Sequence, residues 1–277
     1  MEMKSILSIQ SVHDNAQNVN QIINFAQVNK LHLDMVILAP IVRPYVSVDG
    51  VIMNDITFAE NKELSKKSHA LKEQIIQAGD RQGISMSVVV EIADIALFDR
   101  ILERYANCSD CLVLSQSLMM QNDLVKRSFV HILRDNSCPA ILLVGEGPIF
   151  QDLTNVMIAW DGGVAAAAAI RDAIPILQQA KNISLVCVDP SPDETGDIPG
   201  DDMAHYLVRH KIDVIVELIP SAGQSIAQAL FQKAKDMDAD LVIMGGYGRS
   251  RLREWILGGT TSDTLSLASC SVFMAHG

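Results

Sequence analysis

The chain has 277 residues, of which 49% are apolar, with a mean hydropathy of +0.21 and a formal net charge of −11 at pH 7. This composition excludes a disordered chain and suits a globular protein long enough for two domains. The negative charge argues against a nucleic-acid partner, because binding a phosphate backbone requires clustered Lys and Arg. No apolar stretch reaches the roughly 18 residues that span a bilayer, and no signal peptide is recognised, so we expect a cytoplasmic protein without a membrane partner.

The first half alternates short apolar segments with helical ones. Strands are predicted near 4–11, 32–39, 85–92, 110–115 and 140–144, and helices near 15–29, 55–82, 95–107 and 123–135. The turn residues from Gly145 to Pro148 then predict a linker.

The second half has the same alternation, with strands predicted near 155–161, 182–188, 212–219, 240–245 and 271–276 and helices between them. Segments such as 184–188 are almost continuously apolar, which is typical of parallel strands covered on both faces. We therefore predict an α/β fold of two tandem, doubly wound domains, 1–147 and 153–277, each with a five-stranded parallel sheet.

The two halves repeat one pattern. The segment 110–114 matches 240–244, 136–141 matches 268–273, and 6–11 matches 156–161. The offset falls from 150 at the front to roughly 130 near the end, so the first half carries about twenty extra residues, which we place between 40 and 72.

A glycine-rich segment follows the fourth predicted strand of the second half. Glycine lets backbone N–H groups approach an anion, and a following helix N-terminus favours negative charge, so the segment predicts a phosphate site. The same glycines could instead serve only as turn residues. Ligands of open α/β sheets bind at the carboxyl ends of strands, so residues after the first, second and fourth strands should converge. The candidates in and beside this segment are Met244, Gly245, Gly246, Gly248, Arg249, Gly258, Gly259, Thr260 and Thr261.

The spacing Gly-x2-Gly-x9-Gly resembles the ATP-binding signature of the universal stress protein family, and nearly the whole chain is similar to a tandem member of that family. The resemblance implies an adenine nucleotide alpha hydrolase-like fold in which Asp161 and the strand end near Val188 hold the adenosine. It also implies that ATP, or AMP or ADP, places its phosphates on the loop glycines and the hydroxyl residues that follow, with Mg or Mn on the phosphates. Here Gly259 stands where the family has Ser or Thr. Asp161 could also cap the helix that begins near Val164.

The first half lacks these features. Ser11 stands where the second half has Asp161, and the segment 115–121 after the fourth strand contains no glycine. We therefore predict one nucleotide site per chain, in the second half, with the first half degenerate.

The leading functional hypothesis is a stress-response protein that acts by binding ATP, with no catalytic residue and no assigned metal ligands. The alternatives are a slow ATPase or adenylyl-transfer enzyme using the same pocket, and an interaction module whose ligand is not a nucleotide. The Cys108–Cys111 spacing lacks the second pair that a zinc site needs, and Cys111 falls inside a predicted strand. The apolar strands 141–144 and 272–275 are the edges expected to pair between halves, and both a monomer and a homodimer fit.

Overall fold

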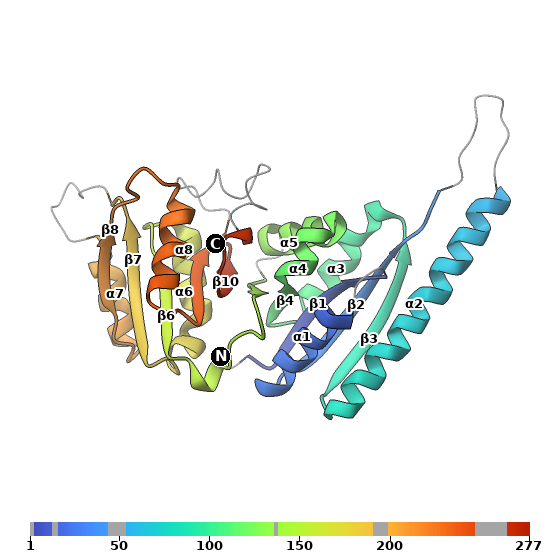
Figure 1. The fold of residues 1–277 in the computed structure, drawn as a ribbon, viewed down its shortest axis with the longest axis horizontal. Helices are drawn as coiled ribbons and strands as arrows, with labels where there is room; N and C mark the ends of the chain where they lie inside the picture. The colour runs from blue at the N-terminus through green and yellow to red at the C-terminus, as the bar shows by residue number, and fades with distance from the viewer. Residues whose placement is uncertain (1–2, 13–15, 44–53, 136–137, 191–198, 247–264) are drawn as a thin grey trace.

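The computed structural model describes residues 3–12, 16–43, 54–135, 138–190, 199–246 and 265–277, which form a single ten-stranded sheet flanked by helices (Figure 1). The strand order is β3-β2-β1-β4-β5-β10-β9-β6-β7-β8. The first five strands are β1 (Ser5–Ser11), β2 (His32–Pro40), β3 (Met86–Ala93), β4 (Cys111–Ser115) and β5 (Ala140–Leu143). The other five are β6 (Asn155–Ala159), β7 (Asn182–Val188), β8 (Ile215–Ile219), β9 (Leu241–Gly245) and β10 (Ser271–Ala275). All ten predicted strands are confirmed, and both halves have the same internal order.

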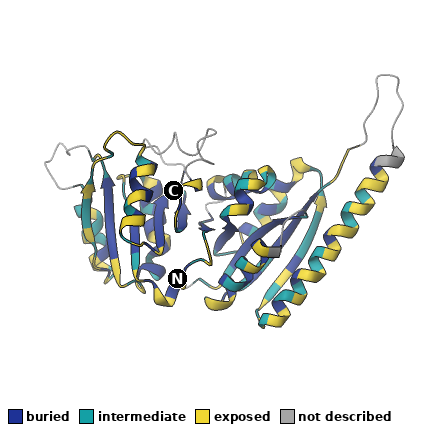
Figure 2. Cartoon of the chain, in the orientation of Figure 1, coloured by how far each residue is buried: buried dark blue, intermediate teal, exposed yellow. Residues whose placement is uncertain are grey.

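Helices cover both faces of the sheet, and alternate strand residues feed one apolar core on each face. One core packs against α3 (Phe98–Ala106), α4 (Gln116–Gln121), α5 (Asp123–Asp135) and α8 (Ile226–Asp236). The other packs against α1 (Ala16–Val28), α2 (Asn54–Gln82), α6 (Val164–Leu177) and α7 (Asp201–Arg209). Short 3-10 turns, η1 (Ile95–Leu97) and η2 (Phe150–Asp152), precede α3 and β6. In Figure 2 most of the strand residues are buried while the outer helix faces are exposed.

The two predicted five-stranded sheets are joined into one. β5 and β10 pair antiparallel, with Ala140 opposite Met274 and Leu142 opposite Val272, while the other strand pairs are parallel. Apart from Ser271, both strands are apolar, and both are almost completely buried; pairing removes two sheet edges that would otherwise be exposed. The predicted contact between these two segments is therefore confirmed.

The extra residues of the first half lie in α2. This helix has 29 residues, whereas its counterpart α7 has 9. The N-terminal part of α2 projects beyond the strands (Figure 1).

The repeat extends to individual hydrogen bonds. The Asp110 carboxylate accepts the backbone N–H groups of Lys4 and Ser5 at 2.8 and 2.9 Å, so it joins the starts of β4 and β1. Asp240 does the same for β9 and β6, accepting two backbone N–H groups at 2.7 and 3.0 Å. Each aspartate thus ties the start of one strand to the start of its neighbour at the same place in the repeat.

Candidate functional site

Asp161 lies just past β6, at the entry to α6. The N–H of Trp160 donates to the Val186 carbonyl at 2.9 Å and so extends the β6·β7 pairing to the residue before Asp161. The exposed Asp161 carboxylate accepts the Gly163 N–H at 2.8 Å, across a turn in which Gly162 has a φ of +74°. The N-cap residue of α6 is Gly163, so the prediction that Asp161 itself caps this helix is wrong. The turn instead fixes the direction of the carboxylate.

The end of β7 lies beside Asp161. Burial raises the pKa of the Cys187 thiol to about 11, and the negative charge of Asp161 adds to this rise. Val188, the last residue of β7, is half-buried and packs against the core. Gly200 approaches from the start of α7, where a Cβ would lie 3.5 Å from the Cys187 sulfur. Cys187 and Gly200 were not predicted from the sequence, since neither position carries a recognisable motif.

Gly245, the last residue of β9, allows α6 to pack directly on the strand. A Cβ at this position would lie 2.4 Å from the backbone nitrogen of Ala166 and 2.7 Å from the carbonyl carbon of Ala165. No side chain fits there, so the first turn of α6 lies against the strand end. Met244 is 2% exposed, so its side chain belongs to the core beneath the end of β9.

Gly246 is held by the end of β10 and by the first half of the chain. Its N–H donates to the Ala275 carbonyl at 2.8 Å, and its own carbonyl accepts from His276 Nδ1 at 2.9 Å. A Cβ would lie 2.9 Å from Cδ2 of Leu133 in α5. The sheet thus takes up this N–H in the structure, and the contact of Gly246 with phosphate stays a prediction. Close packing, rather than a left-handed φ, explains both glycines.

The strand register brings these residues to one edge of the sheet. Ala159 lies opposite Val186 in the β6·β7 pair, and Ile158 lies opposite Ile243 in the β6·β9 pair. Asp161 is thus level with Val188. Gly245 is the last residue of β9, the other neighbour of β6, and it lies at the same edge. The predicted convergence after the first, second and fourth strands is present in the backbone. The remaining predicted residues, Gly248, Arg249, Gly258, Gly259, Thr260 and Thr261, lie outside the described residues.

The corresponding edge of the first half is filled by its own side chains. The Ser115 hydroxyl, at the end of β4, donates to the Asn18 amide oxygen in α1 at 3.1 Å and lies 2.7 Å from the Ser117 hydroxyl. Ser11 and Asn18 are 5% and 3% exposed. α4 begins directly after β4, a helix that the sequence did not predict. At the position of Gly245, which packs against α6, the first half thus has Ser115, whose hydroxyl is hydrogen-bonded to Asn18.

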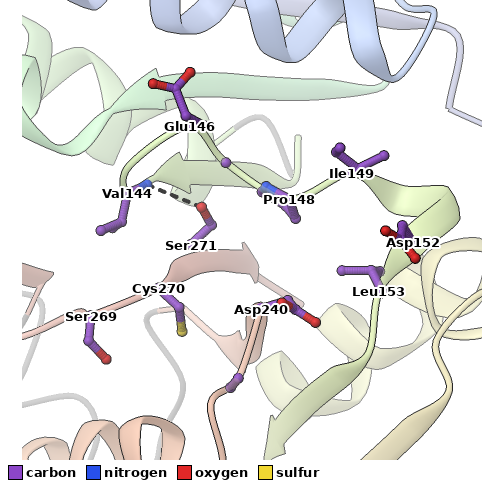
Figure 3. Close-up of a pocket in the computed structure, with 12 residues that line it drawn as sticks. Val144, Glu146, Pro148, Ile149, Asp152, Leu153, Asp240, Ser269, Cys270 and Ser271 are labelled. Atoms are coloured by element: carbon purple, nitrogen blue, oxygen red, sulfur yellow. Dashed lines mark hydrogen bonds between the residues drawn. The ribbon is translucent and has the colours of Figure 1, made fainter.

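Two cavities lined by described residues lie at the other edge, beside the amino ends of strands. One of about 350 Å³ lies at the linker, where the Val144 N–H donates to the Ser271 hydroxyl at 3.1 Å (Figure 3). The other, of about 1040 Å³, lies between the two halves and is lined by α6 and by the segment around Asp110. Neither contains Asp161, Val188 or Gly245.

The described residues offer no metal centre and no redox pair. They contain no group of three or more His, Cys, Asp or Glu side chains placed to hold a metal ion. Cys111 is buried in β4, while Cys108 is exposed. Burial raises the pKa of the Cys111 thiol well above its usual range and that of Cys138 to about 12, so both remain protonated and unreactive at neutral pH. No helix in the described part of the chain has the length and apolar character needed to cross a membrane.

The model of the universal stress protein family matches residues 153–276. Residues 153–276 are thus similar to a universal stress protein domain. The first half folds like a universal stress protein domain as well, because solved structures match the whole chain. A universal stress protein from Archaeoglobus fulgidus DSM 4304 is 15% identical over 98% of this chain and 96% of its own, with a TM-score of 0.70.

A putative universal stress protein from Pseudomonas aeruginosa UCBPP-PA14 is 16% identical over 99% of this chain and 93% of its own, with a TM-score of 0.56. A functionally unknown protein from Pseudomonas aeruginosa PAO1 is also 16% identical, over 99% of this chain and 92% of its own, with a TM-score of 0.52. At these identities the likeness concerns the fold. No curated protein sequence matches the chain.

Proposed function

We propose that this universal stress protein binds ATP in its second domain, 153–277, at the edge formed by Asp161, Val188 and Gly245. The observation that carries the proposal is the contact of Gly245 with the first turn of α6. It places the N-terminus of α6, with its partial positive charge, beside the end of β9, after which the glycine-rich segment begins, and near the oriented carboxylate of Asp161. These groups suit the phosphates and the ribose of one nucleotide.

In this arrangement Asp161 accepts hydrogen bonds from the ribose hydroxyls and Val188 packs against the adenosine. The phosphates take N–H groups from the segment that contains Gly248 and residues 258–261, with Arg249 adding positive charge. Mg or Mn, where present, binds through the phosphates. AMP and ADP fit the same adenosine contacts with fewer phosphate contacts.

The chain binds one nucleotide, because Asn18, Ser115 and Ser117 occupy the corresponding position in the first domain, 1–147. We assign no catalytic residue. The protein acts in the cytoplasm, in a stress response, through a conformation or partner contact that depends on the bound nucleotide. The slow ATPase alternative shares the pocket and differs only in turnover.

The test measures both stoichiometry and the role of Asp161. Protein purified without added nucleotide is denatured and its released small molecules are identified, and ATP binding is then titrated calorimetrically. We expect one equivalent of ATP per chain. Asp161→Ala is expected to raise the Kd about 10- to 100-fold, because hydrogen bonds to a charged group contribute about 1.5–3 kcal/mol.

Ser11→Ala is the matched control, since Ser11 is the first-half counterpart of Asp161, and it should leave the Kd unchanged. Two equivalents of ATP per chain, or no binding by the wild type, would contradict the proposal. Release of ADP over hours, lost in Asp161→Asn while binding persists, would favour the enzyme.

A further inference from the structure

The first half contacts the two described residues that border the segment 247–264. On one side, the Gln116 side-chain amide, at the start of α4, donates to the carbonyls of Leu265 and Ala268 at 2.5 and 3.4 Å. Leu265 and Ala268 are 3% and 6% exposed, and both belong to the core that also contains α4 and α5. On the other side, Leu133 of α5 packs against Gly246, where a Cβ would lie 2.9 Å from the end of the Leu133 side chain.

These two contacts join corresponding residues of the two halves. Gln116 directly follows β4, as Gly246 directly follows β9. Leu133 and Leu265 also correspond, since each lies five residues before the matching cysteine, Cys138 or Cys270. In each half, therefore, the residue after the fourth strand contacts the leucine that precedes the fifth strand of the other half. Only the chemistry differs, with a glycine on one side and a hydrogen-bonding amide on the other.

We propose that Gln116 is a positioning residue for the nucleotide site of the other domain. It fixes Leu265 and Ala268 while Leu133 and the end of β10 fix Gly246, so the first half determines the separation of the two ends of the segment predicted to bind phosphate. The degenerate half thus contributes to binding without touching the nucleotide. This proposal rests on the proposed ATP site.

The proposed contacts predict that loss of the Gln116 amide affects the binding of ATP more than that of adenosine. Asp161 and Val188, proposed to contact adenosine, lie at the ends of β6 and β7, whereas Gln116 and Leu133 lie in α4 and α5. The phosphates are proposed to bind the segment whose ends Gln116 and Leu133 fix. Loss of the Gln116 amide should therefore weaken ATP binding and spare adenosine binding, whereas a general loss of folding would weaken both equally.

The experiment uses the full chain and the variants Gln116→Met, which keeps the length without the donor, and Gln116→Ala. Gln121→Met, on the exposed end of the same helix, is the control. We expect the Kd for ATP to rise about 5- to 10-fold in both Gln116 variants, equivalent to roughly one hydrogen bond, and the Kd for adenosine to change less than about twofold. Calorimetric titration of each ligand measures these values.

Amide hydrogen exchange without nucleotide gives an independent measurement. Exchange at Gly246 and at 265–268 should accelerate about tenfold in Gln116→Met, with no change in β7. Unchanged exchange, or equal weakening of ATP and adenosine, would overturn the positioning role. If wild-type protein binds no ATP, the proposed function fails, and the exchange measurement alone decides whether Gln116 fixes these residues.

Discussion

Replacing Gly245 by alanine tests the contact on which the proposed site depends. The added methyl would lie 2.4 Å from the Ala166 nitrogen and 2.7 Å from the Ala165 carbonyl carbon. Both are backbone atoms in the first turn of α6, so no side-chain rotation can relieve the clash. Either the end of β9 or the start of α6 must move.

The size of the effect follows from two opposing contributions. Overpacking a well-packed interior costs typically about 1–3 kcal/mol, and contact with backbone atoms, which cannot rotate away, puts this case at the upper end. Alanine also restricts the unfolded chain, which returns about 0.4–1 kcal/mol. We therefore expect Gly245→Ala to lower the free energy of unfolding by about 2 kcal/mol and the Tm by roughly 6 °C.

Intrinsic fluorescence during urea and thermal unfolding measures this change in the relevant half, because both tryptophans, Trp160 and Trp255, lie there. Gly246→Ala is the matched control, since its methyl would meet only the end of the flexible Leu133 side chain, at 2.9 Å. It should cost less than about 1 kcal/mol. Equal losses in the two variants, or no loss in Gly245→Ala, would refute the packing argument.

Three further predictions concern residues away from this contact. In native protein at pH 8, a thiol reagent followed by mass spectrometry should modify the exposed Cys108 rapidly and spare Cys138, because burial raises the pKa of Cys138 to about 12. Burial and the hydrogen bond to the Glu91 carboxylate raise the pKa of Tyr105 to about 12. The free energy of unfolding should therefore fall between pH 10, where this tyrosine ionises in the unfolded chain, and pH 12. An ultraviolet titration of Tyr105→Phe should lack the last tyrosine ionisation seen in the wild type. Asp110→Ala and Asp240→Ala should each lower the free energy of unfolding by about 0.5–1.5 kcal/mol in urea titrations, because each removes two hydrogen bonds to a carboxylate that water replaces in part.

Most of the fold could be predicted from the sequence because its strands are short, apolar and separated by helical segments. The repeat was equally visible, since Asp110 and Asp240 begin matching strands. α4 could not be predicted, because six residues without a capping side chain give no periodic signal, and its stability comes from burying Leu118 and Met119 in the shared core. The joining of the two sheets followed from the apolar edge strands 141–144 and 272–275, whereas the antiparallel direction of that pair did not.

The site was predicted less completely. Its position at one edge of the sheet followed from the strand order, and Asp161 and Val188 do meet there. The reasons for the glycines did not follow, because a sequence does not distinguish a glycine that binds an anion from one that packs on a helix. Gly245 packs on α6, and Gly246 gives its N–H to Ala275. Cys187 could not be predicted as a site residue, because only its position beside Asp161 in the fold indicates it.

The duplicated contact between the halves explains what one chain gains over two identical domains. In a symmetric dimer both copies of the contact carry the same residue, so a glycine needed on one side must also stand on the other. Covalent fusion removes that constraint. Gly246 can remain bare against Leu133 while its counterpart Gln116 acquires an amide that holds Leu265. The first half, which lacks the features of a nucleotide site, can then carry after its fourth strand a side chain that positions the site of the second half.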